Sequence, residues 1–224
     1  MKKIGMAVSA WLFLFSVWTE AHESKDEGAE VYRKTSGALV RIHVFSGPDN
    51  AKSIGSGFAV SERLVVTNWH VIEGANRIRL RFVTSGTKWM SGAVVAKSRA
   101  HDLAVVRLSK DAPKFLELRK EGMPPIGSRV YTLGNPDGYD GIIAEGLLSG
   151  IWKSKKSGRE EMQISAPISQ GSSGGPVLDT HGVVIGVAKS VNRKGQNLNF
   201  AAPNKYLLPL IAEVNSSKHR REEN

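Results

Sequence analysis

The sequence predicts an all-β protein, a barrel or sandwich, and its strand spacing suits two stacked barrels. Short runs of alternating apolar and polar residues are typical of strands with one buried face, as in RIRLRFV, where Ile78, Leu80 and Phe82 alternate with arginines. Turn residues separate these runs at regular spacing, as in all-β architectures. The runs fall into two groups, one on each side of the stretch from Leu108 to Gly127.

The expected elements follow in chain order. One or two helical turns are expected within Glu30 to Gly37, with Val31 pointing inward. GSGFAVS and RLVVTN indicate a hairpin, and a terminal helix is expected in YLLPLIAEVN despite its internal proline. The other predicted strands are ALVRIHVF, RIRLRFV, SGAVVAKS, LAVVRL, GSRVYTLGNP, GLLSGIW, EMQISAPI, GVVIGVAKS and NLNFAAP. Residues 37–224 are therefore expected to form one domain, with barrels at roughly 37–115 and 120–203, then a short C-terminal helix and tail.

Residues 1–21 have the pattern of a secretory signal peptide, followed by an N-terminal segment at 22–36. A short positive head precedes an apolar run from Ile4 to Trp18, and small residues at Thr19 and Ala21 suit a cleavage site. The run is short for a bilayer span of about 20 residues, and an uncleaved anchor is the alternative. The lysine head suits bacterial export, so a periplasmic or secreted protein is expected, with no membrane span after cleavage. The chain has no cysteine, so its stability must come from its core.

The net charge of +10 is compatible with a nucleic-acid, anionic-lipid or acidic-polymer partner. The basic residues are spread along the chain, however, and no stripe of basic and aromatic residues resembles a nucleic-acid platform. A soluble protein without a nucleic-acid partner is therefore expected. No His, Asp and Glu spacing suggests a metal site, and no cofactor is expected.

Three motifs stand at predicted strand edges: TNWHV with His70, HDLAVVRL with Asp102, and GSSGGP with Ser173. Each alone is more often structural, because isolated histidines, strand-opening aspartates and Gly-Ser loops are common. Together they give the chain order His, Asp, Ser, which is the order used by the two-barrel serine proteases. Loops at strand edges can expose such side chains on a rigid scaffold.

The segments GSGFAVSERLVVTNWHVIEGA, HDLAVVRL, TLGNP and SQGSSGGPVLDTHGVVIGVA resemble the trypsin-like serine proteases of the HtrA/Deg type. The resemblance runs from about Tyr32 to Pro203. It implies a chymotrypsin-like double β-barrel with the site between the barrels, and endopeptidase activity against unfolded or damaged envelope proteins. Members of this family are often trimers, which adds a homo-oligomer to the polypeptide substrates expected as partners.

The resemblance implies a role for each motif residue. Ser173 is the expected nucleophile, His70 the general base and then acid, and Asp102 the group that orients the imidazole. The backbone N–H groups of Gly171 and Ser173, with Ser172 between them, are expected to form the oxyanion hole. Gly171 would allow backbone dihedral angles that a side chain resists.

The sequence departs from pancreatic-type proteases just before the nucleophile. Ser172 stands where those proteases have an aspartate that captures a new N-terminus, and no IVGG-like start is present. Activation by such a cleavage is therefore not expected. The HtrA/Deg type usually carries PDZ domains after the protease, and the residues after Pro203 are too few for one, so control by a PDZ domain within this chain is not expected.

The primary substrate pocket is expected between SAPISQ and VAKS. Neither segment contains an acidic residue, so a preference for Lys or Arg is not expected, and Ile168 and Ala188 suggest a small or medium apolar residue. Lys189 either faces solvent or attracts an acidic substrate residue. His101 and His181 have no evident role.

Two functions from different classes remain open. The first is a secreted serine endopeptidase with the triad His70, Asp102 and Ser173. The second is a chaperone or pseudoprotease that binds polypeptides on the same fold with little hydrolysis. A basic nucleic-acid binder is a third reading, which predicts DNA affinity that falls steeply with salt.

Overall fold

The structure is a computed structural model that describes residues 27–47, 51–83, 86, 88–153, 158–191 and 198–222. The predicted signal peptide, residues 1–21, lies outside the described residues, as do residues 22–26 of the predicted N-terminal segment. No helix among the described residues combines the length and apolar character needed to cross a bilayer.

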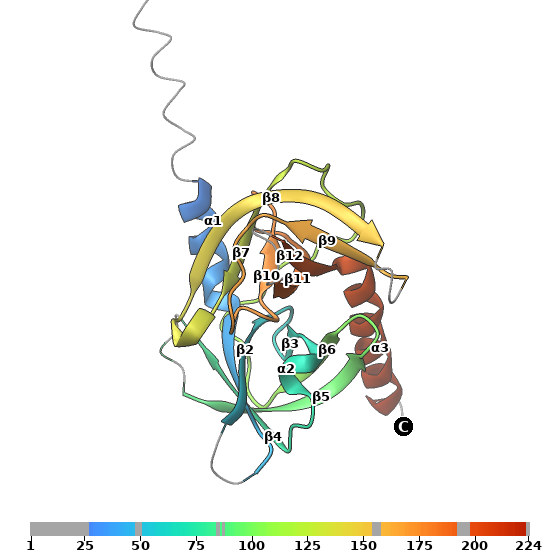
Figure 1. Ribbon diagram of the computed structural model, residues 1–224. Coiled ribbons are helices and arrows are strands. Elements are labelled where there is room, and N and C mark those ends of the chain that lie inside the picture. The colour runs from blue at the N-terminus through green and yellow to red at the C-terminus, as the bar shows by residue number, and fades with distance from the viewer. Residues whose placement is uncertain are drawn as a thin grey trace, which may run out of the picture.

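Two closed antiparallel barrels of six strands each make up most of the molecule (Figure 1). In barrel 1 the strands are ordered β1-β2-β3-β6-β5-β4 around the barrel. Its strands are β1 (Leu39–Phe45), β2 (Ala51–Ala59), β3 (Leu64–Thr67), β4 (Arg77–Phe82), β5 (Met90–Ser98) and β6 (Leu103–Leu108). The predicted β2–β3 hairpin is present, with Phe58 opposite Val66.

Barrel 2 repeats this closed arrangement in the order β10-β11-β12-β9-β8-β7. Its strands are β7 (Arg129–Gly134), β8 (Ile142–Lys153), β9 (Glu160–Ile164), β10 (Pro176–Leu178), β11 (Val184–Val191) and β12 (Asn199–Pro203). The prediction of an all-β double barrel is thus confirmed. Strand β8 is longer than the segment GLLSGIW, because polar and apolar residues on both sides of that segment pair with β7 and β9.

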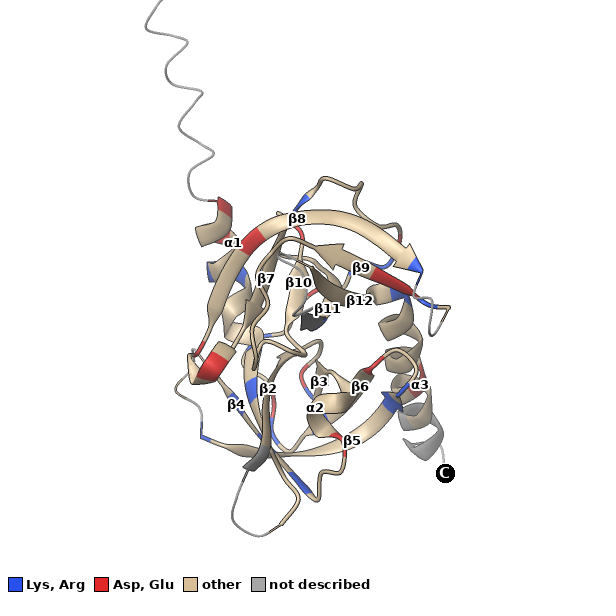
Figure 2. Ribbon diagram, viewed as in Figure 1, with Lys and Arg blue, Asp and Glu red and all other residues tan. Residues whose placement is uncertain are grey.

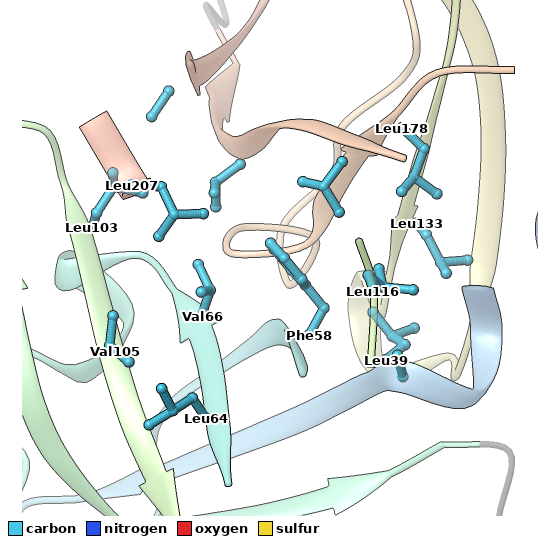
Figure 3. Packing of buried hydrophobic residues seen from close by; sticks show 14 of the residues in the cluster. Leu39, Phe58, Leu64, Val66, Leu103, Val105, Leu116, Leu133, Leu178 and Leu207 are labelled. Atoms are coloured by element: carbon cyan, nitrogen blue, oxygen red, sulfur yellow. The ribbon is translucent and has the colours of Figure 1, made fainter. Parts of the chain in front are cut away.

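One hydrophobic core cluster joins the two barrels (Figure 3). Phe58 of barrel 1 and Leu133 and Leu178 of barrel 2 belong to this cluster, together with Leu116 from the connection between the barrels. These side chains are at most 5% exposed. Each barrel also has its own smaller cluster. The shared cluster fixes how the two barrels meet, and the cleft described below lies where they meet.

The helix α1 (Glu27–Thr35) lies beside β7 and β8, and its Val31 is fully buried, as predicted. The C-terminal helix α3 (Asn204–Glu222) packs on β5 and β6. The predicted C-terminal helix is present, and α3 is longer than the expected segment YLLPLIAEVN because it continues on both sides. Pro209 removes one helical hydrogen bond. Burial of Leu207, Leu210 and Val214 along one face stabilises the helix on both sides of that proline.

Candidate active site

His70 and Asp102 are brought together by two neighbouring strands of barrel 1. His70 lies on the single-turn helix α2 (Trp69–Ile72), which begins directly after β3, and Asp102 stands just before β6. Strands β3 and β6 are paired, with Thr67 opposite Ala104. The end of one strand therefore lies beside the start of the other, which places the two side chains in contact.

The Asp102 carboxylate is held on both of its oxygens by His70. Oδ2 lies 2.7 Å from His70 Nδ1, and Oδ1 accepts the backbone N–H of His70 at 2.9 Å. Asn68 Nδ2 also donates to the Asp102 carbonyl at 2.9 Å. The Asp102 side chain is 15% exposed, whereas the His70 side chain is 48% exposed. This arrangement fixes Nδ1 of the imidazole against the carboxylate and leaves much of the ring accessible.

Trp69 supports the short helix that carries His70. The Lys97 ammonium lies 4.8 Å and the Arg99 guanidinium 5.2 Å from the Trp69 ring centroid. Trp69 Nε1 also donates to Glu73 Oε1 at 3.3 Å. Cation–π contacts of this kind stabilise by about 0.5–1 kcal/mol at exposed sites. They therefore help to hold a helix of one turn, which has little stability by itself.

Ser173 lies in the glycine-rich turn that precedes β10, and this turn is bound to both barrels. The Ser173 carbonyl accepts the N–H of Ser56 from barrel 1 at 2.9 Å, and the N–H of Gly174 donates to the Ala188 carbonyl of barrel 2 at 2.9 Å. The hydroxyl of Ser173 donates to the Lys189 carbonyl at 3.1 Å. Among the described residues, no hydrogen bond joins this hydroxyl to His70.

The backbone N–H groups around Ser173 differ in whether they already donate a hydrogen bond within the protein. The N–H of Ser172 donates to the Ser169 carbonyl at 3.0 Å, so it is occupied. Within the described part of the chain, the N–H groups of Gly171 and Ser173 have no protein acceptor. Of the three residues predicted at the oxyanion hole, two therefore offer an available donor.

The backbone conformation and the close packing at position 171 both require a glycine. Its φ is 93°, a region that side chains disfavour, and a Cβ there would lie 2.6 Å from the Asn135 carbonyl oxygen. The N–H of Asp137 donates to the Gln170 carbonyl at 2.9 Å. Because the atoms of a trans peptide group are coplanar with C=O and N–H opposed, this bond directs the Gly171 N–H away from Asp137.

Two buried polar residues that the sequence analysis missed, Ser56 and Asn135, hold the turn that carries Ser173. Ser56 Oγ donates to the Gly171 carbonyl at 2.7 Å and accepts the N–H of Asn135 at 2.9 Å. Asn135 Nδ2 donates to the Val40 carbonyl at 3.0 Å, which connects the β7–β8 loop to barrel 1. Both Ser56 and Asn135 are fully buried. The Asn-Pro pair that follows β7 is the sequence signal that could have identified Asn135, because the polar groups of a buried turn need hydrogen-bond partners.

His70, Asp102 and Ser173 line one cleft of about 470 Å³. Its other lining residues are Ser53, Ile54, Val71, Ile168, Ser169, Gln170, Gly171 and Lys189. Of the residues predicted for the substrate pocket, Ile168 and Lys189 line this cleft. Ala188 instead lines a separate cavity of about 70 Å³, together with Ser172.

The ammonium of Lys189 is paired within the protein. Its Nζ donates to Glu161 Oε1 of β9 at 2.7 Å, and the Lys189 side chain is 24% exposed. A partly buried ammonium with a carboxylate partner is less available to an acidic substrate group than a free one.

His101 stacks on Tyr206, with the ring centroids 3.9 Å apart. Burial lowers the pKa of His101, and the positive charges of Arg159 and Lys189 lower it further.

Two barrels with a His–Asp pair and a serine in the cleft between them define the class of the trypsin-like peptidases. The sequence matches the trypsin-like peptidase domain family over residues 55–187, and the chain belongs to this family. Its relatives place it with the HtrA/Deg type. Protease Do-like 5, chloroplastic, of Arabidopsis thaliana is 30% identical over 214 residues, covering 80% of this chain and 66% of the relative. Serine protease HTRA2, mitochondrial, of Bos taurus is 32% identical over 188 residues, covering 78% of this chain and 40% of the relative.

Solved structures are similar in fold. Deg5 is 28% identical and superposes with a TM-score of 0.71, covering 85% of this chain and 94% of that structure. The serine endoprotease from Yersinia pestis has a TM-score of 0.72 at 23% identity, covering 84% of this chain and 66% of that structure. At this identity the second similarity shows the fold alone. The chain spans only part of its curated relatives. It covers 66% of Protease Do-like 5, 40% of HTRA2 and 34% of the probable periplasmic DegP-like endoprotease of Hahella chejuensis.

Proposed function

We propose that this chain is a serine endopeptidase in which Ser173 is the nucleophile, His70 the general base and Asp102 the orienting carboxylate. The observation that carries the proposal is the 2.7 Å contact between His70 Nδ1 and Asp102 Oδ2 in a cleft that Ser173 also lines. A carboxylate at Nδ1 favours the tautomer with the proton on that nitrogen, which leaves Nε2 free to accept the serine proton.

The reaction begins with rotation of the Ser173 side chain from the Lys189 carbonyl toward His70 Nε2. The Ser173 oxygen then attacks the carbonyl carbon of the scissile peptide while its proton passes to Nε2. The N–H groups of Gly171 and Ser173 stabilise the oxyanion, each by about 3 kcal/mol in the transition state. The imidazolium protonates the leaving amine, the C–N bond breaks, and water hydrolyses the acyl-enzyme by the same route.

The substrates we propose are unfolded or damaged polypeptides, cut after small or medium apolar residues. The cleft is open and its lining residue Ile168 is apolar, which suits an extended chain better than a folded surface. We also propose a periplasmic or secreted location, because residues 1–21 have the pattern of a signal peptide and relatives are named periplasmic DegP-like endoproteases. A homotrimer is the proposed assembly, and light scattering of the purified protein measures it.

Cleavage of a chemically unfolded protein and of its folded form tests this function. The proposal expects fragments from the unfolded form, few from the folded form, and none from either with the Ser173→Ala variant. Mass spectrometry of the fragments gives the residue before each cut. A wild-type protein that leaves the unfolded form intact, or a Ser173→Ala variant that cleaves as well as the wild type, contradicts the proposal.

One observation favours the second candidate, a polypeptide-binding module with little hydrolysis. The Ser173 hydroxyl is bonded to the Lys189 carbonyl rather than to His70. A protein of this kind would suppress aggregation of an unfolded protein equally well as wild type and as Ser173→Ala, with no fragments from either. The same assay therefore separates the two candidates.

A further inference from the structure

A row of side chains leads from the cleft across the outside of barrel 1. Ile54 of β2 stands opposite His43 of β1, and His43 stands opposite Arg79 of β4. Residues directly opposite on paired strands point to the same face, so these three side chains share the outer face of the barrel. Ile54 is 46% exposed and lines the cleft with Ser173. The row therefore starts at the candidate active site.

Arginines dominate this outer face. Arg77, Arg79 and Arg81 occupy alternate positions of β4, and Arg41 stands opposite Arg81 on β1. We call these four residues the arginine face; Figure 2 shows blue segments on β4. Asp140 of the β7–β8 loop already lies on it, with its carboxylate oxygens 2.8 Å from Arg41 Nη2 and 2.8 Å from Arg81 Nη2. The face thus binds one carboxylate of the protein itself.

Arg79 ends the row that starts at Ile54, and it is the member of the arginine face that remains available to a carboxylate. It is exposed and has no carboxylate partner among the described residues. Its guanidinium lies 5.9 Å from the ring centroid of Trp89, and that ring is 4.3 Å from His43. An arginine beside an aromatic ring is partly preorganised, so it loses less side-chain freedom on binding a carboxylate than a free side chain would.

We infer that the arginine face selects polypeptide substrates that carry acidic side chains on the leaving-group side of the scissile bond. This inference rests on the proposed endopeptidase function. The available amides of Gly171 and Ser173 belong to the turn before β10, so the acyl half of the substrate lies against barrel 2. His70 and Ile54 belong to barrel 1, so the leaving-group half crosses barrel 1 and meets the row described above.

The spacing of the strands sets where the acidic residue falls. Ile54 and Arg79 are separated by two strand spacings of about 4.8 Å each, or roughly 10 Å. An extended peptide advances about 3.3 Å per residue, so it covers that distance in about three residues. Since Ile54 borders the cleft, the favoured acidic residue lies about three to five residues beyond the scissile bond.

A set of paired peptides tests the inference. The two peptides of a pair share one cleavable core and differ only in having Glu or Gln at the third to fifth positions after the scissile bond. We expect kcat/KM to be about threefold to fivefold higher for the Glu peptide at low salt, with a smaller ratio at 0.5 M salt because exposed charge pairs are screened. In parallel, fluorescence anisotropy of the same peptides with the Ser173→Ala variant is expected to give a lower Kd for the Glu peptide by a similar factor.

Matched variants assign the effect to the arginine face. Arg79→Gln is expected to reduce both ratios to about one, mainly by lowering kcat/KM and raising Kd for the Glu peptide. Arg107→Gln removes the same charge from β6 of the same barrel, where Arg107 lines a different cavity, and it is expected to keep the preference.

Equal cleavage and equal binding of the Glu and Gln peptides overturn the inference and leave the proposed function intact. A preference that survives in Arg79→Gln also overturns it. A protein that cleaves neither peptide and binds neither as Ser173→Ala contradicts the proposed function, and the inference with it.

Discussion

At the scale of single residues, Asp102 combines a disfavoured backbone conformation with a contact to His70 in the candidate site. Its φ is 56°, a left-handed conformation that non-glycine residues seldom adopt, although Asp and Asn tolerate it best. In this conformation both carboxylate oxygens reach His70, at Nδ1 and at the backbone N–H. The motif HDLAVVRL identified Asp102 as a candidate site residue. It did not predict the backbone conformation, which depends on the neighbouring strand and on Asn68.

The Asp102→Asn variant tests the role of that carboxylate with little disturbance of the fold. Asn tolerates the left-handed conformation, so the free energy of unfolding should change little. The amide cannot hold the same tautomer of His70, and we expect kcat to fall by about 10⁴. Urea denaturation and steady-state kinetics measure the two quantities. A variant that keeps more than a tenth of the wild-type kcat would show that Asp102 does not orient the base.

His43 makes a second residue-scale prediction, on pH. Burial, and then the positive charges of Arg41, Arg81 and Arg79, lower the pKa of His43 below its ordinary value of 6.5. The unfolded chain therefore binds this proton more readily than the folded chain does. The free energy of unfolding should fall as the pH drops through about 6.5, and this contribution should stop growing below the folded-state pKa.

Urea denaturation of the wild type and His43→Gln between pH 8 and pH 4.5 measures this contribution. The variant is expected to lose less stability than the wild type over the acidic part of the range. Parallel curves for the two proteins would mean that His43 keeps its ordinary pKa in the folded state.

At the scale of elements, the β7–β8 loop connects barrel 1 to the turn that carries Ser173. Arg41 and Arg81 hold the loop through Asp140, and Arg41 also donates to the Gly138 carbonyl. From the same loop, the Asp137 N–H fixes the Gln170 carbonyl and so the direction of the Gly171 N–H. Only a few residues of this loop therefore separate Asp140, which makes the ion pairs, from Asp137, which sets the direction of the proposed oxyanion donor.

The Asp140→Asn variant should therefore impair catalysis more than stability. Loss of the charge pairs should lower the free energy of unfolding by about 1 kcal/mol, because Asp140 is partly exposed. Looser positioning of the Gly171 N–H should lower kcat by about tenfold, with a smaller change in KM. Asp137→Asn is the matched control, since it retains the backbone N–H and should behave as the wild type. Equal kcat for Asp140→Asn and wild type would separate the loop from the oxyanion donors.

The element scale also shows what the sequence could predict. Strands with a clear period of two, such as the arginine-bearing strand β4, were predicted close to their observed bounds. The residues Ser56 and Asn135 were missed because their importance comes from hydrogen bonds between segments far apart in the chain. The length of α3 was underestimated because residues 204–205 and 216–222, on both sides of the expected segment, are polar and carry no apolar periodicity that would extend the predicted helix.

At the scale of the whole molecule, the two barrels are stabilised as one unit. The shared core includes Leu39 and Phe58 of barrel 1, Leu133 and Leu178 of barrel 2, and Leu207 of α3. In Figure 3 Phe58 lies between Leu207 on one side and Leu39, Leu133 and Leu178 on the other. The proposed reaction needs this junction to be rigid, because a small displacement of barrel 1 relative to barrel 2 would separate His70 from Ser173.

Calorimetry of the wild type and of Leu207→Ala tests this unity. We expect one cooperative transition in both proteins, with the variant less stable by about 2–5 kcal/mol, because Leu207 is fully buried. Ile126→Ala is the control; Ile126 is 64% exposed, and its loss should change stability by less than about 0.5 kcal/mol. Two separate transitions would show that the barrels unfold independently.

The central claim is that His70, Asp102 and Ser173 act together on an electrophile in the cleft, and covalent labelling with a fluorophosphonate tests it most directly. Intact-mass and peptide mass spectrometry should find one adduct, on Ser173, in the wild type. The adduct should be absent in Ser173→Ala and should form far more slowly in His70→Ala. A wild-type protein that remains unlabelled, or one labelled at another residue and equally well in His70→Ala, would contradict the account.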